Sequence, residues 1–279
     1  MSISKKIKVV FTNSFLTLLS VIWLFPVFWL LMTSFRWERG SYSSYIIPRT
    51  FTLENYSKLF TDTTIYNFPR WWSNTFFVAT LSCLLTSFIV ISTAFVFSRL
   101  RFKARRPMMA VLLIMGMFPG FMSMIAIYYI LKGMGIAKTL ISLVLVYSGG
   151  GMLGYYISKG FFDTIPKSID EAALLDGATK WNLFTKIILP LSKPIIIYTA
   201  LISFISPWAD LIFAQMILGD NYENYTVAVG MFQMLSRQSI DTWYTRFCAA
   251  AVLVSIPISI LFMCLQRFYV EGLSGSVKG

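Results

Sequence analysis

The chain contains no histidine, only three cysteines and few acidic residues, and each shortage excludes a class of function. Without histidine, most protein metal sites and all His-based acid–base catalysis are excluded. Cys83, Cys248 and Cys264 fall inside long apolar runs, and their spacing builds neither a disulfide framework nor a metal site. The patterns G-x-S-x-G and G-x-x-x-x-G-K-[ST] are also missing. We therefore expect no catalytic residue, no metal, no directly bound cofactor and no P-loop ATPase in this chain.

Charge is scarce as well. Only 13% of the residues are charged, against about a quarter in a typical soluble domain, whereas 57% are hydrophobic. The net charge of +12 could indicate nucleic-acid binding, but the basic residues cluster in a few short loops and are not interleaved with stacking aromatics. Such clusters are typical of the cytoplasmic loops of membrane proteins, so we expect lipid and not nucleic acid as the surroundings.

Long apolar runs take up most of the sequence, and each is long enough to cross a hydrocarbon core about 30 Å thick. They predict an all-α integral membrane protein with a single transmembrane domain over residues 1–279. The six expected spans are 9–32, 73–97, 107–131, 139–157, 194–218 and 247–268. Most of the 24 Lys and Arg residues, among them five between Arg99 and Arg106, fall on one side of this topology. Both termini are therefore expected to be cytoplasmic.

Several local features refine these spans. We expect each internal proline to kink its span, and the four are Pro26, Pro119, Pro207 and Pro257. Two Gly-x-x-x-Gly pairs, 116–120 and 150–154, permit close helix approach. Packing of helices explains both pairs better than a functional role does. A short helix is predicted at 53–60. Trp71 and Trp72 precede the second span, where an interfacial aromatic belt is expected.

Asp210 is the one acidic residue that falls within a predicted span. A charge at that depth costs about 2.5–3.5 kcal/mol on insertion scales, so its side chain should face a bundle interior or a water-filled path. Lining of a pathway and a polar packing contact explain it equally well. A proton-coupling role is disfavoured, because no second intramembrane acid or histidine completes a relay.

The polar insert at 163–190 predicts two short helices between the fourth and fifth spans. Ser168 and Glu171 have the spacing of a capping box, and Gly177 should end the first helix. The second helix is expected at 180–189, where Pro190 helps to stop it. A helix pair in this place is suited to a groove on a partner protein. The alternative, an interfacial helix lying on lipid, is disfavoured because Asp170, Glu171 and Asp176 would be repelled by anionic headgroups.

The same insert carries a family resemblance. Its residues Glu171-Ala172-Ala173, Gly177 and Ile187-x-Leu189-Pro190 match without a gap the EAA motif of permeases of ABC importers. Segments 51–56, 97–103 and 272–279 resemble carbohydrate-importer permeases, and 159–165 and 225–231 resemble the MalG-type half of the maltose/maltodextrin branch. The sequence thus resembles the permease subunits of ABC importers for carbohydrates.

The resemblance implies a set of partners and roles. They are a second, MalF-like permease subunit, two ATPase subunits that hold ATP and Mg²⁺, and an extracytoplasmic sugar-binding protein, all at the cell membrane of a prokaryote. The residues that would couple this chain to an ATPase subunit are Glu171, Ala172, Ala173, Leu174, Asp176 and Gly177. The external loop 219–245 would contact the binding protein, and the tail from Gly272 would touch the ATPase pair. No sugar-binding residue is assigned.

Other functions explain the sequence less well. An importer of another oligosaccharide, of the raffinose or multiple-sugar type, would share every motif above. An ion-coupled secondary transporter would need coupling charges near the midplane and usually internal repeats. Only Asp210 meets the first requirement, and no repeat is evident.

Overall fold

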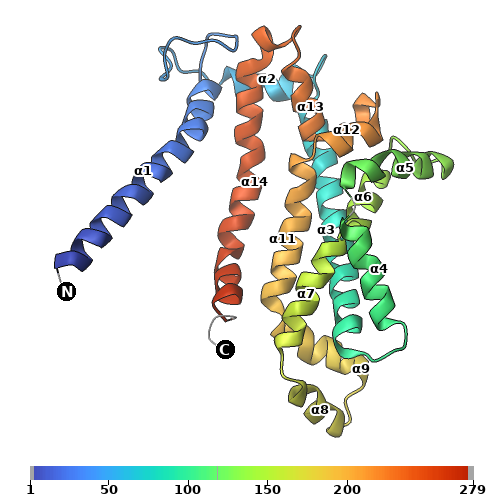
Figure 1. The fold of residues 1–279 in the computed structure, drawn as a ribbon. Helices are drawn as coiled ribbons and strands as arrows, with labels where there is room; N and C mark the ends of the chain where they lie inside the picture. The colour runs from blue at the N-terminus through green and yellow to red at the C-terminus, as the bar shows by residue number, and fades with distance from the viewer. Residues whose placement is uncertain (1–2, 118, 276–279) are drawn as a thin grey trace. The chain divides into compact units, whose positions relative to one another are not determined.

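The structure, a computed structural model, describes residues 3–117 and 119–275, and these residues are almost entirely helical (Figure 1). Over this part of the chain there is no strand, only an isolated antiparallel bridge between Arg36 and Phe51. The all-α prediction is confirmed. The end of the expected cytoplasmic tail, residues 276–279, lies outside the described residues.

Three helices are long and apolar enough to cross a membrane without a break. They are α1 (Ile3–Ser34), α3 (Phe68–Arg99) and α14 (Ile240–Gly275), in which the apolar stretches are Lys8–Ser34, Phe68–Arg99 and Ile240–Gln266. Their mean hydropathy lies between 2.1 and 2.5. Pro26 and Pro257 lie inside α1 and α14, which continue past them.

Three further stretches pass the same test only as bent pairs of helices. The pairs are α4 (Arg105–Met117) with α5 (Gly120–Gly133), bent by 102°; α6 (Leu140–Gly149) with the part Gly154–Thr164 of α7 (Met152–Thr164), bent by 42°; and Lys180–Leu191 with α11 (Lys193–Ala209), bent by 80°. Counting each pair as one span gives six, the expected number. The third pair covers 180–209, however, and does not coincide with the expected fifth span, 194–218.

The third expected span, 107–131, is therefore not one continuous helix. Pro119 is the residue before α5, and its ψ of 123° is not helical. Proline has no N–H to donate to the preceding turn, so the helical hydrogen-bond ladder stops there. Figure 1 shows α5 turned away from α4.

By its internal contacts the chain divides into two compact units. Unit 1 comprises the chain up to Pro69 together with Met231–Ile256, and unit 2 comprises Arg70–Gly230 together with the chain from Pro257. In unit 1 the expected short helix is observed as α2 (Glu54–Thr61). Asn55 on α2 donates to the carbonyl oxygens of Ser34 and Arg36 at 2.9 and 2.8 Å, and accepts from the Thr245 hydroxyl at 2.9 Å. One buried amide thus joins α2 to the ends of α1 and α14.

In unit 2 the start of α7 packs against α3. A side chain added at Gly151 would lie 3.1 Å from Val90 on α3, and one added at Gly154 would lie 3.6 Å from it. The tight contact with α3 is thus at Gly151, whereas Gly154 of the predicted pair is in ordinary van der Waals contact and Gly150 faces the carbonyl oxygen of Val146 in its own turn. At Gly120, in the other pair, an added side chain would meet open space.

Trp71 differs from its expected place in an interfacial belt. Its side chain is buried and lies against Gly230 on α13 (Val227–Met234). Trp72 is partly exposed and stacks on Phe76 with ring centroids 5.5 Å apart. The first tryptophan is a packing residue because α13 has a glycine at the point of contact.

Candidate functional site

The insert at 163–190, called the EAA segment below, contains a first helix, α8, that runs from Lys167 to Leu175. Pro166 is its N-cap residue, and no side chain caps it. The predicted capping box of Ser168 and Glu171 is therefore wrong. Because the helix begins directly after Pro166, Ser168 lies inside the first turn, where its hydroxyl is not placed to cap the free backbone N–H groups.

The end of α8 is as predicted. Gly177 has a φ of +82°, the left-handed conformation that glycine adopts without strain. The N–H groups of Ala178 and Gly177 donate to the carbonyl oxygens of Ala173 and Leu174 at 2.9 and 3.1 Å. These two bonds form a Schellman motif and fix the direction in which the chain leaves α8.

The second helix of the segment is continuous but changes type. It consists of α9 (Lys180–Asn182), the π-helical turn η1 (Leu183–Ile188) and α10 (Leu189–Leu191). The Thr179 hydroxyl caps it by accepting from the N–H of Asn182 at 3.2 Å. Pro190 does not end it; the helix continues to Leu191, and α11 begins at Lys193 after the bend of 80°. π-helical turns occur frequently at functional sites.

A hydrophobic core lies beneath this segment. Ala173 of α8 is buried in it, together with Leu183, Phe184 and Ile188 of η1. The other buried members come from α3, α7, the turn after α7 and α11: Ile91, Ala94, Phe95, Phe162, Ile165 and Ile195. Each Å² of apolar surface that this core removes from water stabilises the folded protein by about 25 cal/mol. The EAA segment is thus packed onto the ends of three helices of unit 2 and is not a free loop.

The opposite side of α8 is open. The residues that form this exposed face are Glu171, Ala172, Leu174, Leu175 and Asp176, with Trp181 beyond the turn. Leu175 is 88% exposed and Trp181 67% exposed. Of the six residues predicted to couple to a partner, the structure places four on the exposed face, buries Ala173 beneath it and uses Gly177 to end the helix.

Arg99, at the end of α3, binds the buried side of the EAA segment. Its side chain is 2% exposed, and Nη2 donates to the carbonyl oxygens of Phe162 and Ile165 at 2.9 and 3.0 Å. Nε lies 3.3 Å from Oδ2 of Asp170 on α8, forming an ion pair without hydrogen-bond geometry. Burial raises the pKa of the Asp170 carboxyl above its usual range, against the opposing effect of the Arg99 guanidinium. One guanidinium therefore joins α3, α7 and α8.

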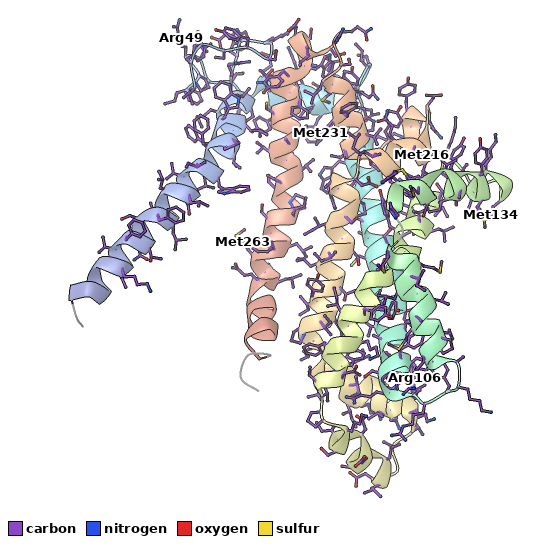
Figure 2. All side chains as sticks on the ribbon, viewed as in Figure 1. Arg49, Arg106, Met134, Met216, Met231 and Met263 are labelled. Carbon is purple, nitrogen blue, oxygen red and sulfur yellow. The ribbon has the colours of Figure 1, made fainter. Side chains whose placement is uncertain are left out.

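A second polar contact lies beside it. The Ser98 hydroxyl donates to Oδ1 of Asp163 at 2.6 Å, and Lys159 pairs with Oδ2 at 2.5 Å. Neither Arg99 nor this contact was predicted from the sequence, because five basic residues within eight positions, 99–106, indicate topology. Figure 2 shows Arg106, from the same basic cluster, at the end of unit 2 where the EAA segment lies.

Asp210 lies in a break between helices. It is the residue after α11, and α12 (Ile212–Leu218) follows it. Oδ1 accepts from the N–H of Phe213 at 3.1 Å, and Oδ2 accepts from the Tyr147 hydroxyl at 2.6 Å. The expected fifth span, 194–218, is thus interrupted at Asp210.

A cavity of about 510 Å³ opens beside this carboxylate. Its walls come from α3, α5, α6, α11 and α12, and from the glycines at 150 and 151 between α6 and α7. Asp210 and Tyr147 both line it. Asp210 therefore makes a polar packing contact, with Tyr147, and also lies on the wall of a cavity.

No group of three or more metal-ligating side chains is found within 3–117 and 119–275, and the three cysteines are free thiols. Apolar spans, broken helices and a packed polar segment are features of a multi-pass membrane protein. The chain belongs to the family described as the binding-protein-dependent transport system inner membrane component, which matches residues 90–275.

Two relatives and one solved structure extend this likeness over the whole chain. The galactooligosaccharides transport system permease protein GanQ of Bacillus subtilis is 33% identical over 100% of this chain and 99% of its own. The maltodextrin transport system permease protein MdxG of the same organism is 32% identical over the same shares. A bacterial ABC transporter involved in the import of the acidic polysaccharide alginate shares the fold, with a TM-score of 0.82, 18% identity and coverage of 96% and 99%.

Proposed function

We propose that this chain is a permease subunit of an ABC importer that moves a sugar into the cytoplasm, and that ATP is hydrolysed on separate subunits docked at the EAA segment. The observation that carries the proposal is the two-sided construction of α8. One side is fixed by the core and Arg99, and the other presents Glu171, Leu174 and Leu175 to a partner. Relatives that are permeases for oligosaccharides support the sugar.

In this proposal the exposed face fits a groove on an ATPase subunit. Leu174, Leu175 and Trp181 supply apolar contact, and Glu171 and Asp176 supply orientation. Closure of two ATPase subunits around ATP and Mg²⁺ then moves α8. Because α8 shares its core with α3, α7 and α11, those helices move with it.

The full assembly would contain a second, MalF-like permease subunit, two ATPase subunits and an extracytoplasmic sugar-binding protein, in the cell membrane of a prokaryote. Both termini and the EAA segment would face the cytoplasm, and the loop 219–245 would face the binding protein. We propose maltodextrin as the sugar, on the motifs at 159–165 and 225–231. The relatives do not separate it from a galactooligosaccharide, since their identities differ by a single percentage point.

The function is tested by uptake of labelled maltotriose in cells that lack this gene, with and without the gene restored. Loss and rescue of uptake are expected, with competition by maltodextrins and not by raffinose or galactotriose. Unchanged maltotriose uptake would exclude maltodextrin as the substrate. The same assay with labelled galactotriose and raffinose then decides whether the chain imports any of these sugars.

The docking proposal predicts the effect of Glu171→Lys. Reversing one charge on the exposed face should reduce the recovery of ATPase subunits with the affinity-purified permease by about tenfold or more, because like charges in an interface cost several kcal/mol. Glu171 is exposed, so the chain should still enter the membrane in normal amount.

Two variants control this experiment. Glu171→Gln keeps the shape and should retain most of the assembly. Asp220→Lys reverses an exposed charge outside the EAA segment and should leave the recovery of ATPase subunits unchanged. Normal assembly and normal sugar uptake by a well-expressed Glu171→Lys protein would contradict the proposal.

A further inference from the structure

The cavity beside Asp210 is of the size and character of a small-molecule site. Its volume of about 510 Å³ falls within the range of roughly 300–1,000 Å³ that is usual for ligand pockets. Most of the wall is apolar, and the polar side chains on it are Thr86, Tyr147, Ser203, Ser206 and Asp210. A few polar groups on an apolar wall are typical of pockets that orient a ligand.

The carboxylate of Asp210 is held ready to accept further hydrogen bonds. Its two oxygens already accept from the Phe213 N–H and the Tyr147 hydroxyl, which fixes the side chain and its orientation. An ionised carboxylate has about four acceptor sites, so two remain for a ligand. Hydroxyl groups that donate to a carboxylate form shorter and stronger bonds than neutral pairs do. A polyol is the ligand that supplies many such donors.

The charge of the lining is one-sided. Asp210 is the only acidic side chain among the described residues that line the cavity, and no Lys or Arg accompanies it. In a site of low dielectric constant a single negative charge repels an anion strongly. Phe121 and Phe213 add aromatic surface on which the apolar faces of a sugar ring can pack.

We propose that this cavity binds the sugar in transit, that Asp210, oriented by Tyr147, accepts hydrogen bonds from sugar hydroxyls, and that its charge selects uncharged sugars over uronates. This inference rests on the proposed function as a sugar permease. It adds a binding site within this chain and a rule for the class of sugar that passes.

The test measures the electric field and the occupancy of the cavity separately. Ser206 lines the cavity and is exposed in it, so Ser206→Cys places a reactive thiol there. The three natural cysteines are replaced by serine, and the assembled complex is reconstituted in vesicles and checked for uptake of maltotriose. The thiol then reacts with a cationic and an anionic methanethiosulfonate reagent, each rate being normalised to a small free thiol.

The cationic reagent should react about tenfold faster or more than the anionic one, because Asp210 lies on the same wall. Asp210→Asn should bring the two rates together while keeping an oxygen for the Phe213 N–H. Asp220→Asn, an exposed residue outside the cavity, should not change the ratio. Equal rates for both reagents with Asp210 present would overturn the assignment of charge selectivity.

Occupancy is measured by protection. Maltotriose should slow both reagents severalfold, and trigalacturonate, an acidic trisaccharide of similar size, should not. In the Asp210→Asn complex protection by maltotriose should weaken, and the difference between the two sugars should shrink. Tyr147→Phe should also weaken protection, because it removes the donor that orients the carboxylate.

Maltotriose transport without protection of the thiol would overturn this inference and leave the proposed function intact. A complex that transports galactotriose in place of maltotriose is tested with galactotriose as the protecting sugar. A complex that transports none of the sugars tested would remove the proposed function itself. The two failures are therefore distinguishable.

Discussion

A Gly230→Val protein should fail to yield a folded chain. Any Cβ at position 230 would lie 2.2 Å from two ring atoms of Trp71, far inside van der Waals contact. Overpacking a core by a methylene costs typically about 1–3 kcal/mol, and this contact is tighter than such cases. Gly230 is helical and donates to the carbonyl oxygen of Thr226 at 2.8 Å, so the backbone cannot yield without losing that bond.

The measurement is the fraction of detergent-extracted protein that elutes as a single species, together with its thermal midpoint. Gly230→Ala should lower both, and Gly230→Val should nearly abolish the folded fraction. Trp71→Leu combined with Gly230→Ala should recover much of the loss, because it removes the ring that the methyl group meets. Gly133→Ala is the matched control, since a Cβ there meets nothing within 4 Å. A normal Gly230→Val protein would show that the contact with Trp71 is wrong.

Replacement of Arg99 by Met should weaken the attachment of α8 to α3 and α7, although the hydrophobic core of the EAA segment remains. The change leaves the Asp170 carboxylate without its partner and removes the guanidinium donor from the carbonyl oxygens of Phe162 and Ile165, of which the first keeps the N–H of Ile165 at 3.2 Å. Removing one member of a buried pair typically destabilises by about 3–5 kcal/mol. We expect reduced thermal stability and about a tenfold or greater loss of sugar transport per ATP hydrolysed in the reconstituted complex.

A double-mutant cycle isolates the ion pair from the two carbonyl bonds. Asp170→Asn alone should be milder than Arg99→Met, and the double variant should be less impaired than the sum of the two. Arg99→Lys keeps the charge but not the geometry that reaches two carbonyls, so it should recover only part of the loss. Arg101→Met removes an exposed charge from the same cluster and should have little effect. Additive effects of the two single changes would contradict the pairing.

The parts of this structure that the sequence predicts are those set by local chemistry. Gly177 ends α8 because only a left-handed residue completes the two closing hydrogen bonds. The helix α2 lies within one residue of its predicted bounds at both ends. The long apolar runs become helices because no other structure satisfies the backbone in lipid.

One miss is local: Ser168 has no capping role because Pro166 is the N-cap residue and the helix begins at Lys167. The other parts that were missed depend on contacts distant in the sequence. Arg99 belongs to a basic cluster that indicates topology, and only its packing against α7 shows that its side chain is buried. Trp71 has the position of an interfacial aromatic, and only Gly230, far along the chain, shows why it is inside.

The π-helical turn η1 has a consequence for how this chain can vary. A π turn takes in one residue more than an α turn, whereas each residue of an α-helix advances by about 100° around the axis. Loss of one residue from Leu183–Ile188 can therefore be absorbed, because the π turn closes into an α turn and Trp181 keeps nearly the same angle relative to the residues that follow. Loss of a residue from the α-helical turns on either side cannot be absorbed in this way and would rotate the exposed face by about 100°. The π turn is thus the point in this helix where chain length can change by one residue with the least effect on the exposed face.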